Sequence, residues 1–442
     1  MIFKLIKQDK IFIIVSVLVG ILMINVHMGS DDLLWVNRFN AGNQYSMLSD
    51  YETWSSRILI NKIVMIFLIT LQGLWPVYMA VMTYLFFKAM EHISPNKIYI
   101  HTFIASIFLM IPFYFETSAG WICTTCSYYG PIACSILSLV PIKKILYDES
   151  IKSWEYFIYA VALLYGTNCE QGLVLNLAGY VALLLYLGYK KIVNKYLCMG
   201  TIFLICNLIF TLTCPGNLNR KFAEINRYPS YELLDITDKL DLGISTTLHM
   251  LVFKENTLLW TLAIVLGLCI WKKYDELKYR IIAVYPVIIL SLLGPLKSIL
   301  ERIDSRAMEV FREIPMYGLI NVDMARIEII QGILLISVII CITSGILLVY
   351  EYPRECLQGM FLWIIGLVTR FIMGFSPTVF ASGTRTFELL YVCVALLVVH
   401  IVSSNYNLLK QWIENQYIQM LLYANIIVSL FQIGRMVNTV FE

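Results

Sequence analysis

Long apolar runs constrain this chain more than any other feature. The 442-residue sequence repeatedly carries uncharged stretches of roughly 17–20 residues, the length that a helix needs to cross about 30 Å of hydrocarbon. Only 14% of the residues are charged and 59% are hydrophobic, whereas a soluble domain has about 25% charged residues. This composition excludes a soluble enzyme, a nucleic-acid-binding module and a disordered chain. The sequence therefore predicts an all-α polytopic membrane protein that forms one integral membrane domain over residues 1–442.

The apolar runs predict about 13 transmembrane helices, with a range of about 11–14. The predicted spans are 11–28, 76–93, 99–115, 128–142, 154–167, 170–189, 196–213, 246–271, 280–296, 328–350, 356–374, 386–404 and 417–436. A further stretch, 58–73, could either cross the membrane or lie along its interface. If it lies along the interface and the N-terminus is cytoplasmic, about half of the 33 basic residues fall in short cytoplasmic turns. The positive-inside rule therefore favours an interfacial helix at 58–73.

This topology places the longer loops on the outer face of the membrane. The first outer loop, 29–73, would carry juxtamembrane helices, and 214–245 and 297–327 would form further outer loops. No internal repeat recurs at a fixed period, which disfavours a transporter built from inverted repeats. We therefore expect the protein to act at the outer membrane–water boundary, where membrane lipids are among its partners.

Three carboxylates stand at functionally informative places. Asp31 and Asp32 follow the first span directly, and partial desolvation there raises the pKa of a carboxyl toward a value useful for a general base. The alternative is a polar turn that ends the helix. Glu170 interrupts an apolar stretch that otherwise runs over 154–189, and ionisable groups at such depth are usually functional. The alternative for Glu170 is a simple hairpin turn.

Cations and aromatic residues form a second group of candidates. Arg57, beside Trp54, could anchor the chain at the interface or bind a phosphate, because a guanidinium is a planar and permanently charged fork. In the turn that begins Cys214-Pro-Gly, Asn217 with Arg220 and Lys221 supplies the parts of an anion-binding site or of an ordinary helix stop.

The remaining candidates lie in other outer turns. Tyr129, beside Gly and Pro, could belong to an aromatic belt or to a wall on which a sugar stacks. Arg385 precedes a predicted span and is the likelier ligand contact, whereas Arg370 lies inside a span and is expected to pair with a carboxylate. Cys123 and Cys126 form a C-x-x-C without a second pair, so disulfide, metal or redox chemistry is a minor alternative. The sequence contains no nucleotide-binding or zinc-hydrolase motif.

These motifs together resemble those of the bacterial GT-C-type integral membrane glycosyltransferases, akin to the O-antigen and surface-polysaccharide glucosyltransferases. One departure is Ser56 before Arg57, where the family often has Gly. The motifs that carry the resemblance are Asp31-Asp32, Trp54-Ser-Ser-Arg57, Gly120-Trp121 with Tyr129-Gly-Pro, Asn168-Cys-Glu170, Pro215-Gly-Asn-x-x-Arg220 and Gly383-x-Arg385.

The resemblance implies transfer of a sugar from a polyprenyl-phosphate-linked donor to a cell-envelope glycan or lipid-linked acceptor outside the bacterial cytoplasmic membrane. It assigns the general base to Asp31 or Asp32 and an orienting role toward the sugars to Glu170. The donor phosphate would be held by the cations, which are Arg57, Arg220, Lys221 and Arg385, with Trp54, Tyr129 and Asn217 as further substrate contacts. No cofactor is required, and a divalent metal at the paired Asp residues is unnecessary beside so many cations. A flippase or transporter, or a polymerase or ligase of lipid-linked oligosaccharides, remains an alternative.

Overall fold

The protein is helical throughout the part of the chain that the structure describes. The computed structural model describes residues 9–42, 46–95, 100–303, 313–317 and 326–439, and these residues contain helices and turns but no β-strand. Much of the predicted loop 297–327 lies outside the described residues. Among these residues, seven helices are long and apolar enough to cross a membrane, and the number rises to nine if each of two strongly bent helix pairs counts as one span. The apolar helices indicate a multi-pass membrane protein.

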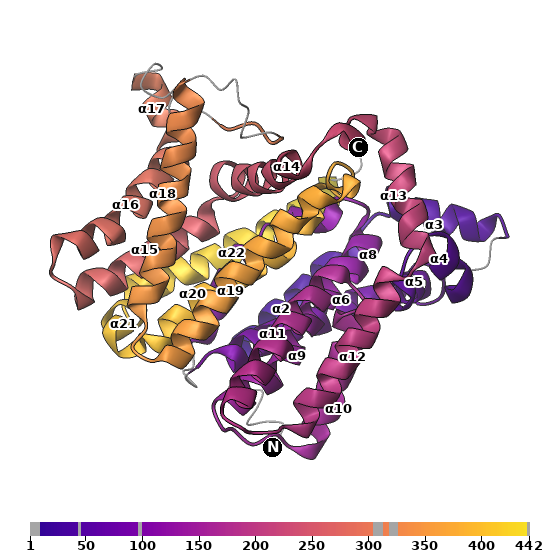
Figure 1. The fold of residues 1–442 in the computed structure, drawn as a ribbon, viewed down its shortest axis with the longest axis horizontal. Coiled ribbons are helices and arrows are strands. Elements are labelled where there is room, and N and C mark those ends of the chain that lie inside the picture. Colours follow the sequence, from indigo (N-terminus) through magenta and orange to yellow (C-terminus); the bar gives the residue numbers. More distant parts are fainter. Residues whose placement is uncertain (1–8, 43–45, 96–99, 304–312, 318–325, 440–442) are drawn as a thin grey trace.

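The first half of the chain forms one group of packed helices (Figure 1). Helix α2 packs against α6, α6 against α9, and α9 against both α10 and α11, which in turn contacts α12. The bounds of these helices are α2 (Lys10–Leu22), α6 (Trp75–Ile93), α7 (His101–Phe108), α9 (Gly130–Leu146), α10 (Ser153–Gly166), α11 (Glu170–Tyr189) and α12 (Lys195–Leu212).

The second half forms a neighbouring group, drawn in orange and yellow in Figure 1. Helix α15 packs against α16, α18 and α20, and α19 packs against α20. The two groups meet through α11 with α19, α7 with α20 and α22, and α2 with α22. The bounds are α15 (Thr257–Lys273), α16 (Leu277–Leu293), α17 (Lys297–Ile303), α18 (Arg326–Val349), α19 (Pro353–Phe371), α20 (Glu388–Ser404), α21 (Tyr406–Ile413) and α22 (Gln416–Thr439).

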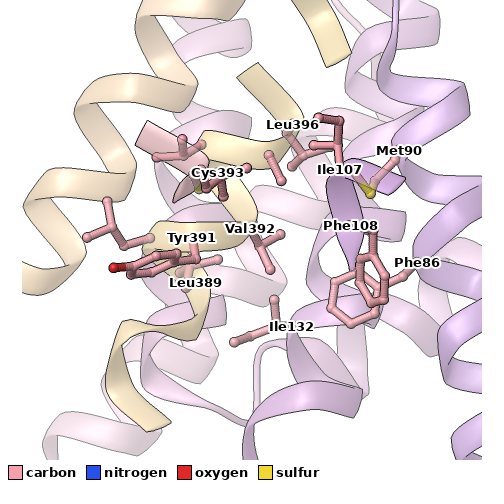
Figure 2. Close-up of a cluster of buried hydrophobic side chains, with 14 of the residues drawn as sticks. Phe86, Met90, Ile107, Phe108, Ile132, Leu389, Tyr391, Val392, Cys393 and Leu396 are labelled. Atoms are coloured by element: carbon pink, nitrogen blue, oxygen red, sulfur yellow. The ribbon is translucent and has the colours of Figure 1, made fainter. Parts of the chain in front are cut away.

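Helix α20 lies at the centre of the molecule. Every residue from Glu388 to Ser403 is buried, which requires neighbours on all sides of the helix. Figure 2 shows side chains of α20, among them Val392 and Leu396, opposite Ile107 and Phe108 of α7. The Phe86 and Phe108 rings have centroids 5.1 Å apart. A helix that is apolar on all faces is expected to be either buried or lipid-facing. Helix α20 is buried because α6, α7, α15 and α19 pack around it.

The predicted number of about 13 spans is not confirmed, and two predicted spans are interrupted. Instead of one helix over 99–115, the chain forms the 8-residue α7, then non-helical residues up to Pro112, then a short 3-10 turn η4 (Phe113–Thr117). The predicted span 246–271 is broken at Glu255 and Asn256, where the helices on either side are bent by 78°. Proline and charged or polar side chains interrupt helices that hydropathy alone would join. Helix α10 has 14 residues, about 21 Å at the usual rise, which is short for a span.

The predicted outer loops contain short helices. Residues 29–57 form α3 (Asp31–Asn40) and α4 (Met47–Thr53), and 214–245 contain α13 (Pro215–Arg227) and the start of α14 (Ile236–Leu248). The stretch predicted to be interfacial forms α5 (Ile58–Met65) and η2 (Ile66–Thr70), which meet the following helix at a bend of 110°. In Figure 1 these elements lie toward the end of the bundle opposite the turns that join α9 to α10 and α11 to α12.

Candidate active site

A cavity of about 350 Å³ lies among the elements that were predicted to carry the functional residues. Its lining comes from α3, the α4–α5 junction, α8 (Trp121–Thr124) with the adjoining η5 (Thr125–Tyr129), α13, and the loop before α20. These segments are far apart in sequence. The five predicted site residues that line this cavity are Asp31, Trp54, Arg57, Arg220 and Arg385.

Helix α3 presents one face to the cavity. Its lining residues are Asp31, Leu34, Trp35 and Arg38, which have the i, i+3, i+4, i+7 spacing of one helical stripe. The Arg38 guanidinium lies 5.9 Å from the centre of the Trp35 ring. Arg38 was not predicted as a site residue, although this spacing from Asp31 is visible in the sequence.

Asp32 is turned away from the cavity and is fully buried. Its carboxylate accepts hydrogen bonds from the backbone N–H of Cys123 at 2.8 Å and of Ile122 at 3.3 Å, in the first turn of α8. Burial raises the pKa of Asp32, and these N–H donors partly offset the rise. Gly120 precedes α8 with φ +90°, and a Cβ there would overlap the Asp32 carboxylate. Of the predicted acidic pair, Asp31 lines the cavity and Asp32 caps a helix.

This difference predicts separate effects of the two acids on stability. We expect Asp32→Ala to lower the free energy of unfolding by about 2 kcal/mol, because two buried N–H groups lose their acceptor. Asp31 accepts no side-chain hydrogen bond among the described residues, so Asp31→Ala should change stability by less than about 0.5 kcal/mol. Denaturation in mixed detergent micelles measures both values. Equal losses in the two variants would contradict the capping role.

Arg57 is held by an ion pair with Glu170. The Arg57 Nε atom donates to Glu170 Oε2 at 2.7 Å, and the guanidinium lies 5.2 Å from the centre of the Tyr128 ring. Burial alone would lower the pKa of Arg57, but the Glu170 carboxylate together with Tyr128 and Cys169 outweighs it and leaves the pKa well above its ordinary value. Glu170 does not itself line the cavity. Its position supports and neutralises Arg57.

Helix α13 contributes a second stripe. Arg220, Glu224 and Arg227 line the cavity at i, i+4 and i+7, whereas Lys221 is exposed on another face of the same helix. Arg227 lies 3.6 Å from Glu224. Burial, followed by the nearby positive charge of Arg57, lowers the pKa of Arg220. Glu224 and Arg227 were missed by the sequence interpretation, although their spacing from Arg220 is regular.

The Pro-Gly-Asn turn fixes α13 against the loop that carries Arg57. A Cβ on Gly216 would overlap the backbone of Trp54 and Ser55, so glycine permits this close approach. The Asn217 amide donates to the Thr211 carbonyl at 2.9 Å and to Ser56 Oγ at 3.3 Å. Asn217 therefore positions α13 against this loop and lies outside the cavity lining.

The loop before α20 supplies the last cation. Arg385 lies in η11 (Gly383–Phe387) and lines the cavity together with Thr378 and Ser382. Its guanidinium is 5.8 Å from the centre of the Tyr128 ring, the same ring that Arg57 approaches. The Arg385 Nε atom is buried and has no hydrogen-bond partner among the described residues. Tyr128 thus lies between two arginines that come from opposite halves of the chain.

The aromatic lining includes the predicted Trp54 but not the predicted Tyr129. Tyr129 is buried in the core, where its hydroxyl lies 2.7 Å from Thr83 Oγ1 and its ring contacts Phe86. The cavity is lined instead by Trp35, Trp54 and the adjacent Tyr128. Successive residues of a helix face different directions, so a sequence pattern cannot easily distinguish Tyr128 from Tyr129.

Charge in the cavity is mainly positive. Five arginines line it, which are Arg38, Arg57, Arg220, Arg227 and Arg385, against the two carboxylates of Asp31 and Glu224. Guanidinium groups bind phosphate through charge-assisted and often bidentate hydrogen bonds. The arrangement suits an anion bound next to one free carboxylate.

Metal-ligand geometry is found elsewhere in the described part of the chain. Asp9, Glu91 and His101 bring one ligand atom each within 4.8 Å of one another. Lys88 forms ion pairs with both Asp9 and Glu91, so both carboxylates of this group already have a cationic partner. Cys123 and Cys126 are both free and buried. No such group of three or more ligands is formed around Asp31 by the described residues.

The expected carboxylate partner of Arg370 is not found among the described residues. Arg370 is 2% exposed and donates to Thr386 Oγ1 at 3.1 Å and Thr246 Oγ1 at 3.3 Å. Its guanidinium lies 3.8 Å from the centre of the Phe387 ring. Hydroxyl groups and an aromatic face therefore replace the ion pair, and Arg370 supports the loop that carries Arg385.

Comparison with known proteins adds no family to this picture. No protein-family model matches the chain, and neither a curated protein nor a solved structure is significantly similar to it.

Proposed function

We propose that this chain is a glycosyltransferase that moves a sugar from a polyprenyl-phosphate-linked donor to a cell-envelope glycan or a lipid-linked acceptor. The observation that carries the proposal is the meeting of Asp31 with Arg57, Arg220 and Arg385 in one cavity. A single free carboxylate among arginines supplies one base and a phosphate-binding cluster, which is what transfer from a lipid phosphate requires.

The proposed reaction uses these groups in separate roles. The Asp31 carboxylate takes the proton of the acceptor hydroxyl while that oxygen attacks the anomeric carbon of the donor sugar. The bond between the anomeric carbon and the phosphate oxygen breaks, and the lipid phosphate leaves with one additional negative charge. Arg220 and Arg385 stabilise that charge. Since these arginines neutralise the leaving group, the reaction requires no divalent metal.

The same proposal includes a GT-C-like arrangement in a bacterial cytoplasmic membrane. The basic pairs Lys143-Lys144 and Lys190-Lys191 lie at the α9–α10 and α11–α12 turns, opposite the cavity end of the bundle (Figure 1). The positive-inside rule then puts these turns and the N-terminus in the cytoplasm and the cavity on the outer face. If the short helices α2, α7, α10 and α16 also cross, the nine candidate spans become thirteen.

Transfer from a defined lipid donor tests the proposal. The purified protein in lipid nanodiscs should transfer radiolabelled hexose from a polyprenyl-phosphate hexose, and not from a nucleotide sugar, to extracted envelope glycolipids. Arg385→Gln should weaken donor binding about tenfold, because a charge-assisted hydrogen bond to phosphate contributes about 1.5–3 kcal/mol.

Arg354→Gln is the matched control, since Arg354 is a half-exposed arginine that donates to the Leu146 carbonyl at the end of α9 and does not line the cavity. Its donor affinity should equal that of the wild type. Movement of an intact lipid-linked sugar across the bilayer without transfer would overturn the proposal in favour of a flippase.

A further inference from the structure

A second cavity of about 500 Å³ lies outside the arginine cavity. It is enclosed by the residues after α7, by the start of α15 and by α22. Tyr114 of η4 lines this second cavity, whereas Ser118, just after η4, lines the arginine cavity. Among the described residues, the two cavities therefore share no lining residue, although both are bordered by this short segment.

Both interruptions of the predicted spans border the second cavity. The non-helical residues Leu109–Pro112 line it, and so does Glu255, which occupies the break between η7 (His249–Lys254) and α15. In a membrane protein, non-helical backbone at membrane depth is tolerated where it is buried in protein or borders a cavity, because unpaired backbone groups are costly in lipid. Two independent breaks at one cavity indicate that the cavity is the reason for both.

Helix α22 turns a polar stripe toward the same cavity. Asn425, Ser429 and Gln432 line it at i, i+4 and i+7. The opposite face of α22 is strongly apolar, with Ile427 66% and Phe431 68% exposed. Polar side chains on a membrane helix are costly and usually functional. The stripe is therefore suited to contact a polar ligand inside the second cavity.

The chemistry of the lining favours hydroxyl groups over phosphate. Tyr114 and Glu255 line the cavity together with Ser429 and Gln432 of α22. The Asn425 amide of the same stripe donates to Ser106 of α7 at 3.0 Å. Arg435 is the one cation in the lining, against five arginines in the first cavity. A carboxylate accepts hydrogen bonds from the hydroxyls of a sugar, and an amide both donates to them and accepts from them, whereas Glu255 would repel a phosphate.

We propose that the second cavity binds the uncharged, hydroxyl-rich headgroup of a glycosylated membrane lipid. The headgroup contacts Glu255 and the α22 stripe, and the apolar residues that include Met110, Ile111 and Val428 contact the start of the lipid chains. This site is separate from the arginine cavity and does not depend on the proposed transfer reaction.

Lipid binding to the full-length protein in nanodiscs tests this site. The probes are monoglucosyl diacylglycerol, diacylglycerol and phosphatidylglycerol, with binding measured by native mass spectrometry. We expect the glucosyl lipid to bind at least about tenfold more tightly than the other two, because each net hydrogen bond contributes about 1 kcal/mol. Equal binding of the three lipids would overturn the proposal.

Variants locate the binding. Glu255→Gln and Gln432→Leu should each weaken binding of the glucosyl lipid about five- to tenfold. Phe431→Leu is the matched control on α22, because Phe431 is exposed and does not line the cavity. If Glu255→Gln disturbs folding, Gln432→Leu decides the result. Arg385→Gln should leave glucosyl-lipid binding unchanged while it weakens donor binding; a loss of both would place the glucosyl lipid in the arginine cavity and refute the separate site.

Discussion

Asp31→Asn should reduce sugar transfer by about 10²–10⁴-fold while donor binding stays within about twofold of the wild type. The factor is the usual contribution of a general base, and it arises because an amide cannot take the proton of the acceptor hydroxyl. Donor binding should persist because Arg57, Arg220 and Arg385 are unchanged and a negative charge near the donor phosphate has been removed. Single-turnover transfer and separate measurement of donor affinity distinguish the two effects.

Glu52→Gln is the control for this substitution. Glu52 is an exposed carboxylate in the same predicted loop as Asp31 and does not line the cavity. Its transfer rate should match the wild type. If Asp31→Asn transferred at the wild-type rate with its fold intact, Asp31 would not be the base, and the proposed mechanism would have to be abandoned.

Glu170→Gln should destabilise the protein by about 2 kcal/mol without weakening donor binding. Removing one partner of a buried ion pair costs about 3–5 kcal/mol, and we reduce this value because 36% of the Glu170 side chain is exposed, against 14% for Arg57. The loss arises because the Arg57 guanidinium would keep its positive charge without the carboxylate that now pairs with it. Denaturation in mixed micelles and donor affinity are the two measurements.

A double-mutant cycle with Arg57→Gln separates pairing from the other possible role of Glu170. If Glu170 mainly supports Arg57, the double variant should be more stable than the sum of the two single losses implies. Additive losses in stability, together with loss of transfer in Glu170→Gln alone, would instead show that Glu170 orients a sugar directly.

The sequence could predict which segments meet, because the alternation of spans determines which turns share an end of the bundle. Arg57, Arg220 and Arg385 lie more than 100 residues from one another and still line one cavity, as a common outer face predicts. The prediction required only the positions of apolar runs and of the charges that interrupt them.

Which of two adjacent residues faces the cavity could not be predicted in the same way. Neighbouring positions on a helix differ by about 100°, so Asp31 and Asp32 separate, as do Arg220 and Lys221. To decide which of two adjacent residues faces the cavity, one must know which element packs against each of them. Asp32 packs against the start of α8, about 90 residues later in the chain. The helical spacing from Asp31 and from Arg220 is nevertheless visible in the sequence. It would have added Arg38 and Arg227 to the predicted site residues.

The span count was less predictable because apolar length does not determine backbone continuity. Runs 99–115 and 246–271 are apolar enough to be read as single spans, yet Pro112 and Glu255 lie where the chain leaves helical geometry. Lys254 and Glu255 inside the second run were the available signal. Two adjacent charged residues in the middle of an apolar run can indicate an interruption of the helix as well as a buried ionised side chain.

The complete enclosure of α20 has a consequence for how the protein is made. This helix leaves the ribosome after most of the helices that surround it, including α6, α7, α15 and α19, have already been synthesised. The earlier helices must therefore either hold a vacant apolar channel or pack provisionally until residue 388 has been translated. The packing of this group of helices is therefore completed from its interior, by a helix that is translated after the neighbours that enclose it.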